Sequence, residues 1–342
     1  MRILTVALAV LVAQLAGPVV AADQVTIAYI GGTADVGFYI ADAKHYLEQE
    51  NIEAKFIVFD SSARMVAPLA TGEIDVGSGA VGAGTYNAFG RGVTLRAVAD
   101  KSRNKGVYSY QGLMVRNDLW DSGAVRTLKD LKGHKFAVTA PGSNEWVVLS
   151  EAARMGGIEL SDIDTTVLSM PQQVAAYAGK AIDASFLPEP FMSAAIKSEV
   201  AVKMMPATTL RDDDVTGVIV YGQKFMADRP DVARRVTRAY IRGLRDYVDA
   251  LKDSRLAGPG ADEVVDILAR YSSVKDKDVL RAIVPHYVDP NGRVGAESLR
   301  KDWDFYKSQG LINGDVTVDQ LIDNSWVDQA VKELGPYTPK TQ

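Results

Sequence analysis

Short apolar runs alternate with segments of helical periodicity in the first third of the chain. Four runs have the length of buried strands, at residues 25–30, 54–59, 72–76 and 95–99. Residues 38–50 and 63–70 instead carry apolar side chains at helical spacing. Strands that alternate with helices in this order build a parallel sheet covered by helices. The pattern therefore predicts a doubly wound α/β lobe.

The same order of elements returns in the middle of the chain. Strands are expected at 136–138, 165–168 and 182–186, and helices at 143–155 and 171–177. The first of these strands breaks at Pro141-Gly142, and Ser143 is well placed to cap the helix that follows. A strand, a glycine turn and a capped helix start present free backbone N–H groups to a ligand. The repeat predicts a second α/β lobe.

Two extended segments are expected to connect the lobes as a hinge, residues 112–115 leading out and residues 217–221 leading back. Periodic segments then predict helices at 230–252, 261–271, 275–284, 295–309 and 318–334, packed mainly on the first lobe. The expected division is 23–113 with 218–342 for the first lobe and its C-terminal helices, and 114–217 for the second lobe.

Residues 1–22 are typical of a secretory signal peptide. Arg2 supplies the positively charged N-terminal region, and the small residues 20–22 fit a cleavage site. Residues 3–16 are apolar but too short for a permanent transmembrane helix. The chain has no cysteine, which excludes a lipid-anchored cysteine, disulfides and thiolate metal sites. We therefore expect a soluble, exported protein of the periplasm, not a lipoprotein, with the mature chain starting near Asp23.

Charge and motif spacing argue against several functions. The formal net charge of −5 gives no basic patch for nucleic acid or for a membrane surface. Residues 77–82 match a dinucleotide fingerprint with Asp100 at about the expected distance, but the match lies on the third strand of its lobe and lacks a convincing crossover helix. The three histidines are too far apart in the sequence for the usual metal-ligand spacings. The acidic residues 212–214 could suggest a divalent ion, but an acidic loop is the commoner explanation. We expect no catalytic residue, no metal and no cofactor.

Ligands of open α/β sheets bind beyond the carboxyl ends of the strands. This rule selects loops from both lobes and suggests a cleft between them. The predicted ligand-binding residues are Gly32, Thr33, Asp35, Phe38, Ser62, Arg64, Ser78, Gly79, Ala80, Gly142, Ser143, Asn144, Trp146 and Glu189.

These residues suggest a mixed chemistry. The amides of residues 142–144 would form an anion nest, and Arg64 would add positive charge. Phe38 and Trp146 could stack on an apolar or aromatic ligand, although core packing is the ordinary role of such side chains. Glu145 and Glu189 could instead accept hydrogen bonds from ligand N–H or O–H groups.

Four stretches in fixed order resemble a known family. They are residues 25–29 before a glycine loop, residues 69–77, residues 128–138 followed by Gly142-Ser143, and residues 182–184 leading to Glu189-Pro190. Their combination over residues 25–252 resembles the periplasmic solute-binding proteins of nitrate/sulfonate/taurine-type ABC transporters and their thiamine-precursor-binding relatives. Many members carry a proline and an aromatic residue after the first glycine loop, whereas this chain has Val36-Gly37-Phe38-Tyr39, so the substrate does not carry over.

The resemblance implies two lobes of the type II-like periplasmic-binding-protein fold, closing on a small solute and docking onto a membrane permease with its ATPase. A related fungal-type thiamine-pyrimidine synthase needs cysteines that this chain lacks. The expected function is capture of a small organic anion, a sulfonate or carboxylate, by a monomer that binds no nucleic acid. Two alternatives stay open: a neutral heterocycle such as a thiamine-pyrimidine precursor, and an exported nucleotide-using enzyme.

Overall fold

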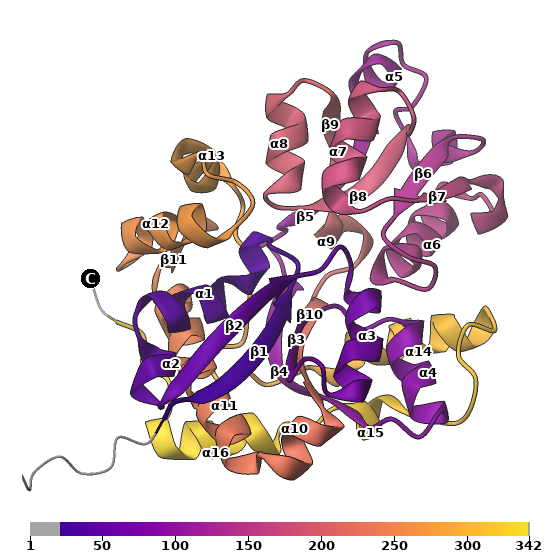
Figure 1. The fold of residues 1–342 in the computed structure, drawn as a ribbon. Coiled ribbons are helices and arrows are strands. Elements are labelled where there is room, and N and C mark those ends of the chain that lie inside the picture. Colours follow the sequence, from indigo (N-terminus) through magenta and orange to yellow (C-terminus); the bar gives the residue numbers. More distant parts are fainter. Residues whose placement is uncertain (1–20, 341–342) are drawn as a thin grey trace, which may run out of the picture.

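The computed structural model describes residues 21–340, so the predicted signal peptide lies almost entirely outside the described residues. The first of its two five-stranded sheets has the order β2-β1-β3-β10-β4 (Figure 1). Its strands are β1 (Asp23–Tyr29), β2 (Ile52–Val58), β3 (Val76–Gly79), β4 (Leu95–Asn104) and β10 (Asp214–Gly222). β1 runs parallel to β2 and β3, whereas β10 is antiparallel to both of its neighbours.

The second sheet repeats this plan with the order β7-β6-β8-β5-β9. Its strands are β5 (Gln111–Arg116), β6 (Lys135–Val138), β7 (Asp164–Val167), β8 (Ala184–Pro188) and β9 (Ala201–Pro206). β6 is parallel to β7 and β8, and β5 is antiparallel to β8 and β9. Each sheet is therefore mixed and not wholly parallel, because its fourth position holds the strand that has just arrived from the other lobe.

The chain passes between the sheets at residues 105–110 and 207–213, outside the segments that the sequence indicated. Residues 112–115 lie within β5 and residues 217–221 within β10. Every residue of β10 is buried, as expected for a strand between two neighbours with both faces covered. The apolar runs predicted to be hinge segments are thus internal sheet strands. We retain the predicted division into lobes as a proposal.

Helices cover both sheets. Those of the first lobe are η1 (Thr33–Asp35), α1 (Val36–Ala43), α2 (Tyr46–Gln49), α3 (Ser62–Thr71) and α4 (Ala83–Gly90). Those of the second are α5 (Asn117–Asp121), η2 (Leu128–Leu131), α6 (Asn144–Gly156), η3 (Leu160–Asp162), α7 (Met170–Ala178) and α8 (Phe191–Lys197), and α9 (Ala207–Leu210) lies in the second crossing. The helix expected at 38–50 is interrupted at His45, which has a φ of 58°. α4 was not predicted, because its small residues carry no periodic signal.

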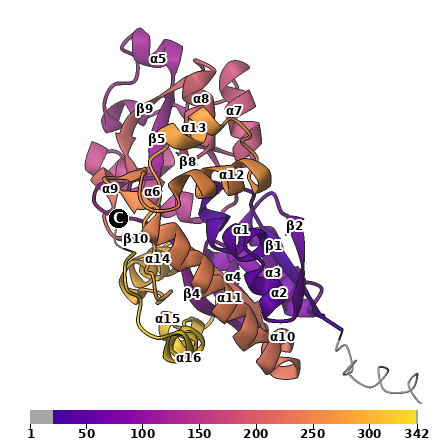
Figure 2. The same ribbon diagram turned by 90° about the vertical axis from the view of Figure 1, so that its left-hand side faces the viewer.

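The C-terminal part is helical, as the sequence indicates. It comprises α10 (Gln223–Asp228), α11 (Pro230–Asp249), the hairpin β11 (Leu251–Lys252) and β12 (Arg255–Leu256), α12 (Ala261–Tyr271), α13 (Lys277–Ala282), α14 (Ala296–Ser308), α15 (Val318–Leu321) and α16 (Ser325–Leu334). α11 packs against α1 and α16 on the first lobe, and α13 lies beside the second lobe, where Asp276 contacts Lys197 (Figure 2). None of the described helices is long and apolar enough to cross a membrane.

Candidate ligand-binding site

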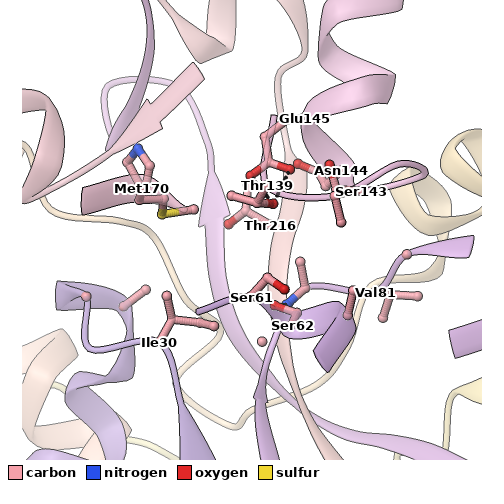
Figure 3. A pocket seen from close by; sticks show the side chains of 18 of the residues that line it. Ile30, Ser61, Ser62, Val81, Thr139, Ser143, Asn144, Glu145, Met170 and Thr216 are labelled. Atoms are coloured by element: carbon pink, nitrogen blue, oxygen red, sulfur yellow. Dashed lines mark hydrogen bonds between the residues drawn. The ribbon is translucent and has the colours of Figure 1, made fainter. Parts of the chain in front are cut away.

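A cavity of about 150 Å³ lies between the two lobes, at the carboxyl ends of their parallel strands. Figure 3 shows the second-lobe side chains Thr139, Ser143, Asn144 and Glu145 facing the first-lobe side chains Ile30, Ser61, Ser62 and Val81 across an open space. Thr216, from β10, stands at the back. Both lobes contribute walls, so the cavity exists only when the lobes are close together.

Helices α3, α4 and α6 are among those that begin at this cavity. Their N-cap residues Ser61, Gly82 and Ser143 make no side-chain capping hydrogen bond. The hydroxyl of Ser143 is buried and has no hydrogen-bond partner. First-turn N–H groups and the positive ends of three helix dipoles therefore face the same space, an arrangement that favours a negatively charged group.

A buried ion pair forms one wall of the cavity. Lys101 Nζ lies 2.7 Å from Asp35 Oδ1, with side chains only 6% and 1% exposed. The Ser78 hydroxyl donates to the same carboxylate oxygen at 2.7 Å, and the N–H of Gly31 donates to the other at 3.1 Å. Lys101 also donates to the carbonyl of Ser78 at 3.2 Å. This network satisfies Asp35 and holds the ammonium group of Lys101 at the cavity.

Two further carboxylates, Glu145 and Glu189, line the second-lobe side. Both oxygens of Glu145 lie 2.9 Å from the hydroxyl of Thr139, which donates to them. Glu189 accepts from the hydroxyl of Ser193 at 2.9 Å and from the N–H of Ser193 at 3.1 Å. Burial raises the pKa of Glu189 to about 7, although these hydrogen bonds act in the opposite direction. The cavity thus offers acceptors as well as donors.

Direct contacts join the lobes at the rim. The hydroxyl of Thr33 donates to the carbonyl of Glu189 at 3.1 Å, and the N–H of Ala83 donates to the carbonyl of Gly142 at 3.0 Å. Both carbonyls belong to the second lobe, and both donors belong to the first. These hydrogen bonds can form only in the closed arrangement, so they define it.

The structure brings most of the predicted site residues together. The residues that line the cavity are Gly32, Asp35, Ser62, Gly79, Ala80, Gly142, Ser143, Asn144 and Glu189. Thr33 and Ser78 stand just behind the wall and support it through the hydrogen bonds given above. Their roles in binding stay predictions.

Three predicted residues lie elsewhere. Phe38 is buried in the first-lobe core, with its ring centroid 4.6 Å from that of Tyr240. Arg64, whose side chain is 72% exposed, pairs with Asp60 at 3.3 Å. Trp146 packs against the second-lobe core. Helix geometry explains these positions, because only one side of a helix start faces the cavity, and we leave the three residues out of the proposed site.

Sequence reasoning missed several lining residues, notably Lys101, Tyr110, Met170 and Thr216. The charged pair Asp100-Lys101 directly after the apolar run 95–99 was a usable signal for Lys101. Tyr110 and Thr216 carry no local signal, because they reach the cavity from a crossing segment and from the strand that returns from the other lobe. Their hydroxyls lie 2.8 Å apart, and each also contacts Ser102.

The raised pKa of Glu189 predicts a pH-dependent stability. The folded chain holds this proton more tightly than the unfolded chain, whose glutamate has the ordinary pKa of 4.5. The stabilisation is therefore complete below about pH 4.5 and is lost as the pH rises through about 7. Glu189→Gln should remove roughly 1–3 kcal/mol of the fall in unfolding free energy between pH 5 and pH 8, as measured in urea. The exposed Glu199→Gln is the control, and an unchanged pH slope in Glu189→Gln would contradict the assignment.

Comparisons with known proteins agree with this architecture. The chain is 28% identical over 225 residues to the "Putative aliphatic sulfonates-binding protein" of Escherichia coli (strain K12), and the match spans 65% of this chain and 64% of that protein. The fold resembles that of the periplasmic nitrate-binding protein NrtA from Synechocystis PCC 6803, with a TM-score of 0.75 and 15% identity, over 92% of this chain and 89% of that chain. The predicted two-lobe periplasmic-binding-protein fold is confirmed.

An enzyme also shares this fold. The desulfurization enzyme DSZB aligns with a TM-score of 0.61 and 14% identity, over 91% of this chain and 99% of that chain. Fold alone therefore does not decide between binding and catalysis. The family model described as "NMT1-like family" matches residues 20–256, more than half of the 342 residues. The chain belongs to the NMT1-like family.

Proposed function

We propose that this protein is the periplasmic solute-binding component of an ABC import system. In this role it captures a small organic solute between its lobes and presents the closed form to a membrane permease driven by an ATPase. One observation carries the proposal: the cavity is built from both lobes, and the lobes are hydrogen-bonded to each other around it. A ligand that touches both lobes makes its full set of contacts only in the closed state, so binding shifts the equilibrium toward closure.

The favoured solute is an organic anion, a sulfonate or carboxylate. The helix starts of α3, α4 and α6 provide the positive potential. The ammonium group of Lys101, although paired with Asp35, is a further hydrogen-bond donor at the cavity. Ile30, Val81 and Met170 provide apolar wall for the rest of the molecule. Since roughly 10–15 Å³ of such space accommodates one water, the cavity admits a molecule of on the order of ten non-hydrogen atoms. The sulfonate name of the Escherichia coli relative supports this class.

A neutral heterocycle rich in N–H groups is the second candidate. Glu145 and Glu189 favour it, because two carboxyl groups at one side of the cavity can accept hydrogen bonds from ring nitrogens and amino groups. Glu189→Gln distinguishes the candidates. It should weaken binding of such a heterocycle, whereas binding of a sulfonate should be unchanged or improved, since a neighbouring negative charge is removed.

We propose binding and not nucleotide-dependent catalysis. The glycines of residues 77–82 have a packing reason, since an added Cβ would lie 2.5 Å from Ser62 Oγ at Gly79 and 2.8 Å from the carbonyl oxygen of Gly142 at Gly82. Asp100, the acid expected to hold a ribose, is fully buried and pairs with Arg103 at 2.9 Å. Close approach between protein segments therefore accounts for the fingerprint without a cofactor.

Thermal unfolding against a panel of solutes tests the proposal. The chain from Asp23 onward is heated with alkyl and aryl sulfonates, carboxylates, nitrate, pyrimidines, flavins and nicotinamide nucleotides. A solute at about a hundred times its Kd should stabilise the protein by about 2.7 kcal/mol, which raises the Tm by a few degrees. Ala80→Trp, which fills the cavity, should abolish the shift, and the exposed loop variant Ala124→Trp should keep it. A shift from nucleotides alone would contradict the proposal.

A further inference from the structure

The helix starts on the two sides of the cavity differ in charge. Neither α3 nor α4, which belong to the first lobe, has an acidic residue in its first turn. On the second-lobe side, α6 carries Glu145 in its first turn, and this side chain lines the cavity. A carboxylate at a helix start offsets the positive end of the helix dipole. An anionic group of a solute is therefore favoured at the starts of α3 and α4 and disfavoured beside Glu145.

The first-lobe side of the cavity has no unpaired carboxylate. Two of its acidic residues line the cavity: Asp35 lies 2.7 Å from Lys101, and Asp60 lies 3.3 Å from Arg64. Among the described residues that line the cavity, Lys101 is the only lysine, arginine or histidine. First-turn residues of α3 and α4 that line the cavity, and whose N–H groups have no acceptor within the helix, include Ser62, Ala63 and Gly84. This side can therefore receive an acidic group.

Glu145, on the other side, is buried with unused capacity to accept hydrogen bonds. The residue is 9% exposed, and both of its carboxylate oxygens share one donor, the hydroxyl of Thr139 (Figure 3). Glu189 differs, because one of its oxygens accepts from the hydroxyl and the other from the N–H of Ser193. A buried carboxylate with a single neutral donor gains from a further N–H group, and a solute in the cavity can supply it.

The apolar part of the wall fits a ring. Apolar side chains from both lobes line the cavity, and they include Ile30, Val81, Met170 and Phe191. A ring that carries a short acidic group and an amino group has about the size that the cavity admits. Its rigid frame also holds the two polar groups apart, so little rotational freedom is lost when each group meets its own side of the cavity.

We propose that the solute is an aromatic acid with an amino group opposite its acidic group, and that Glu145 selects it by accepting a hydrogen bond from the amino group. The acidic group lies at the starts of α3 and α4, and the amino group lies against the second-lobe side. The inference rests on the proposed function, because it assumes that this cavity holds the captured solute. It goes further by assigning one polar group of the solute to each lobe.

Calorimetric titration of the parent protein with three solutes tests both ends of the ligand. para-Aminobenzenesulfonate has both polar groups, para-toluenesulfonate has a methyl group of similar size in place of the amino group, and para-toluidine lacks the acidic group. para-Aminobenzenesulfonate should bind about 10- to 100-fold more tightly than para-toluenesulfonate, because its N–H groups reach a buried carboxylate. para-Toluidine should bind at least about tenfold more weakly than para-aminobenzenesulfonate, because no anion then meets the helix starts.

Glu145→Gln tests which residue selects the amino group. This variant should lose most of the preference for para-aminobenzenesulfonate over para-toluenesulfonate. Its affinity for para-toluenesulfonate should be unchanged or higher, because a neighbouring negative charge is removed. Glu151→Gln is the matched control, since it makes the same substitution on α6 at a side chain that lies outside this cavity, and it should keep the parental preference.

The preference of the parent protein does not depend on any variant, so it remains a test if Glu145→Gln folds poorly. Equal affinities of the parent for para-aminobenzenesulfonate and para-toluenesulfonate would overturn the proposed selection. An undiminished preference in Glu145→Gln would do the same, and so would a failure of all three solutes to bind. The proposed function would survive each of these results if another non-nucleotide solute of the thermal panel stabilised the protein.

Discussion

Replacing Lys101 by methionine should lower the free energy of unfolding by about 3–5 kcal/mol, because it leaves the carboxylate of Asp35 buried without its cation. Lys101 and Asp35 are 6% and 1% exposed and lie 2.7 Å apart. Such a pair contributes little net stability by itself, yet removal of one partner exposes the full desolvation penalty of the other. Urea unfolding followed by tryptophan fluorescence measures the loss.

A double-mutant cycle separates the charge effect from lost packing. Lys101→Met combined with Asp35→Asn should recover most of the stability, since no unpaired charge then remains in the wall. The matched control is Lys105→Met, which removes a lysine whose side chain is 45% exposed and which pairs with Asp213 at 3.2 Å. Its expected loss is at most about 1 kcal/mol. If the double variant were as unstable as Lys101→Met, the buried charge would not be the cause.

Gly82→Ala should weaken solute binding by about 10- to 100-fold while leaving the ligand-free protein folded. A Cβ at this position would lie 2.8 Å from the carbonyl oxygen of Gly142 in the opposite lobe. That contact exists only when the lobes are closed, so the clash penalises the closed state and leaves the open state unaffected. Calorimetric titration with whichever panel solute stabilises the parent measures the affinity, and the Tm without solute reports on the fold.

Gly179→Ala is the matched control for this experiment. Its Cβ would meet only backbone oxygens at 3.9 and 4.0 Å within the second lobe, which is ordinary contact. Its affinity should equal that of the parent. An equal loss of affinity in both variants would indicate a general effect of alanine on the lobes. An unchanged affinity in Gly82→Ala would show that the lobes bind solute without the closure seen here.

Much of the fold could be predicted, because apolar runs and helical periodicity are local properties. Most strands of both lobes and most C-terminal helices lie close to their expected positions. However, β9 was not predicted, β3 begins where the strand expected at 72–76 was to end, and the helix expected at 318–334 is divided into α15 and α16. The main error was at the crossings, since a buried central strand and an extended hinge segment look alike in sequence. β5 is an antiparallel strand of the second sheet, and β10 is an antiparallel strand of the first sheet. Only the neighbouring strands determine whether such a segment is part of a sheet.

The candidate site was predictable where it follows the ends of strands. The positions at Gly32, Ser62, Gly79 and Ser143 line the cavity because carboxyl ends of parallel strands meet there. The expected anion partner Arg64 points to solvent, whereas Lys101 reaches the cavity. The position of a loop after a strand predicts that it lies at the cavity, but it does not predict the direction in which a side chain of the following helix points.

The sequence by itself determined the two α/β lobes, the loops that meet between them and the absence of any cysteine. These features were predictable because periodicity, glycine turns and composition are properties of the sequence alone. Only the tertiary structure decided which polar side chains meet at or beside the cavity: Lys101 with Asp35, and Asn144 with Asp302, which is 158 residues away in the chain. Such pairs depend on how distant elements pack. Burial then changes the free energy of the charged form of each residue, because desolvation is a property of the folded surroundings and not of the residue itself.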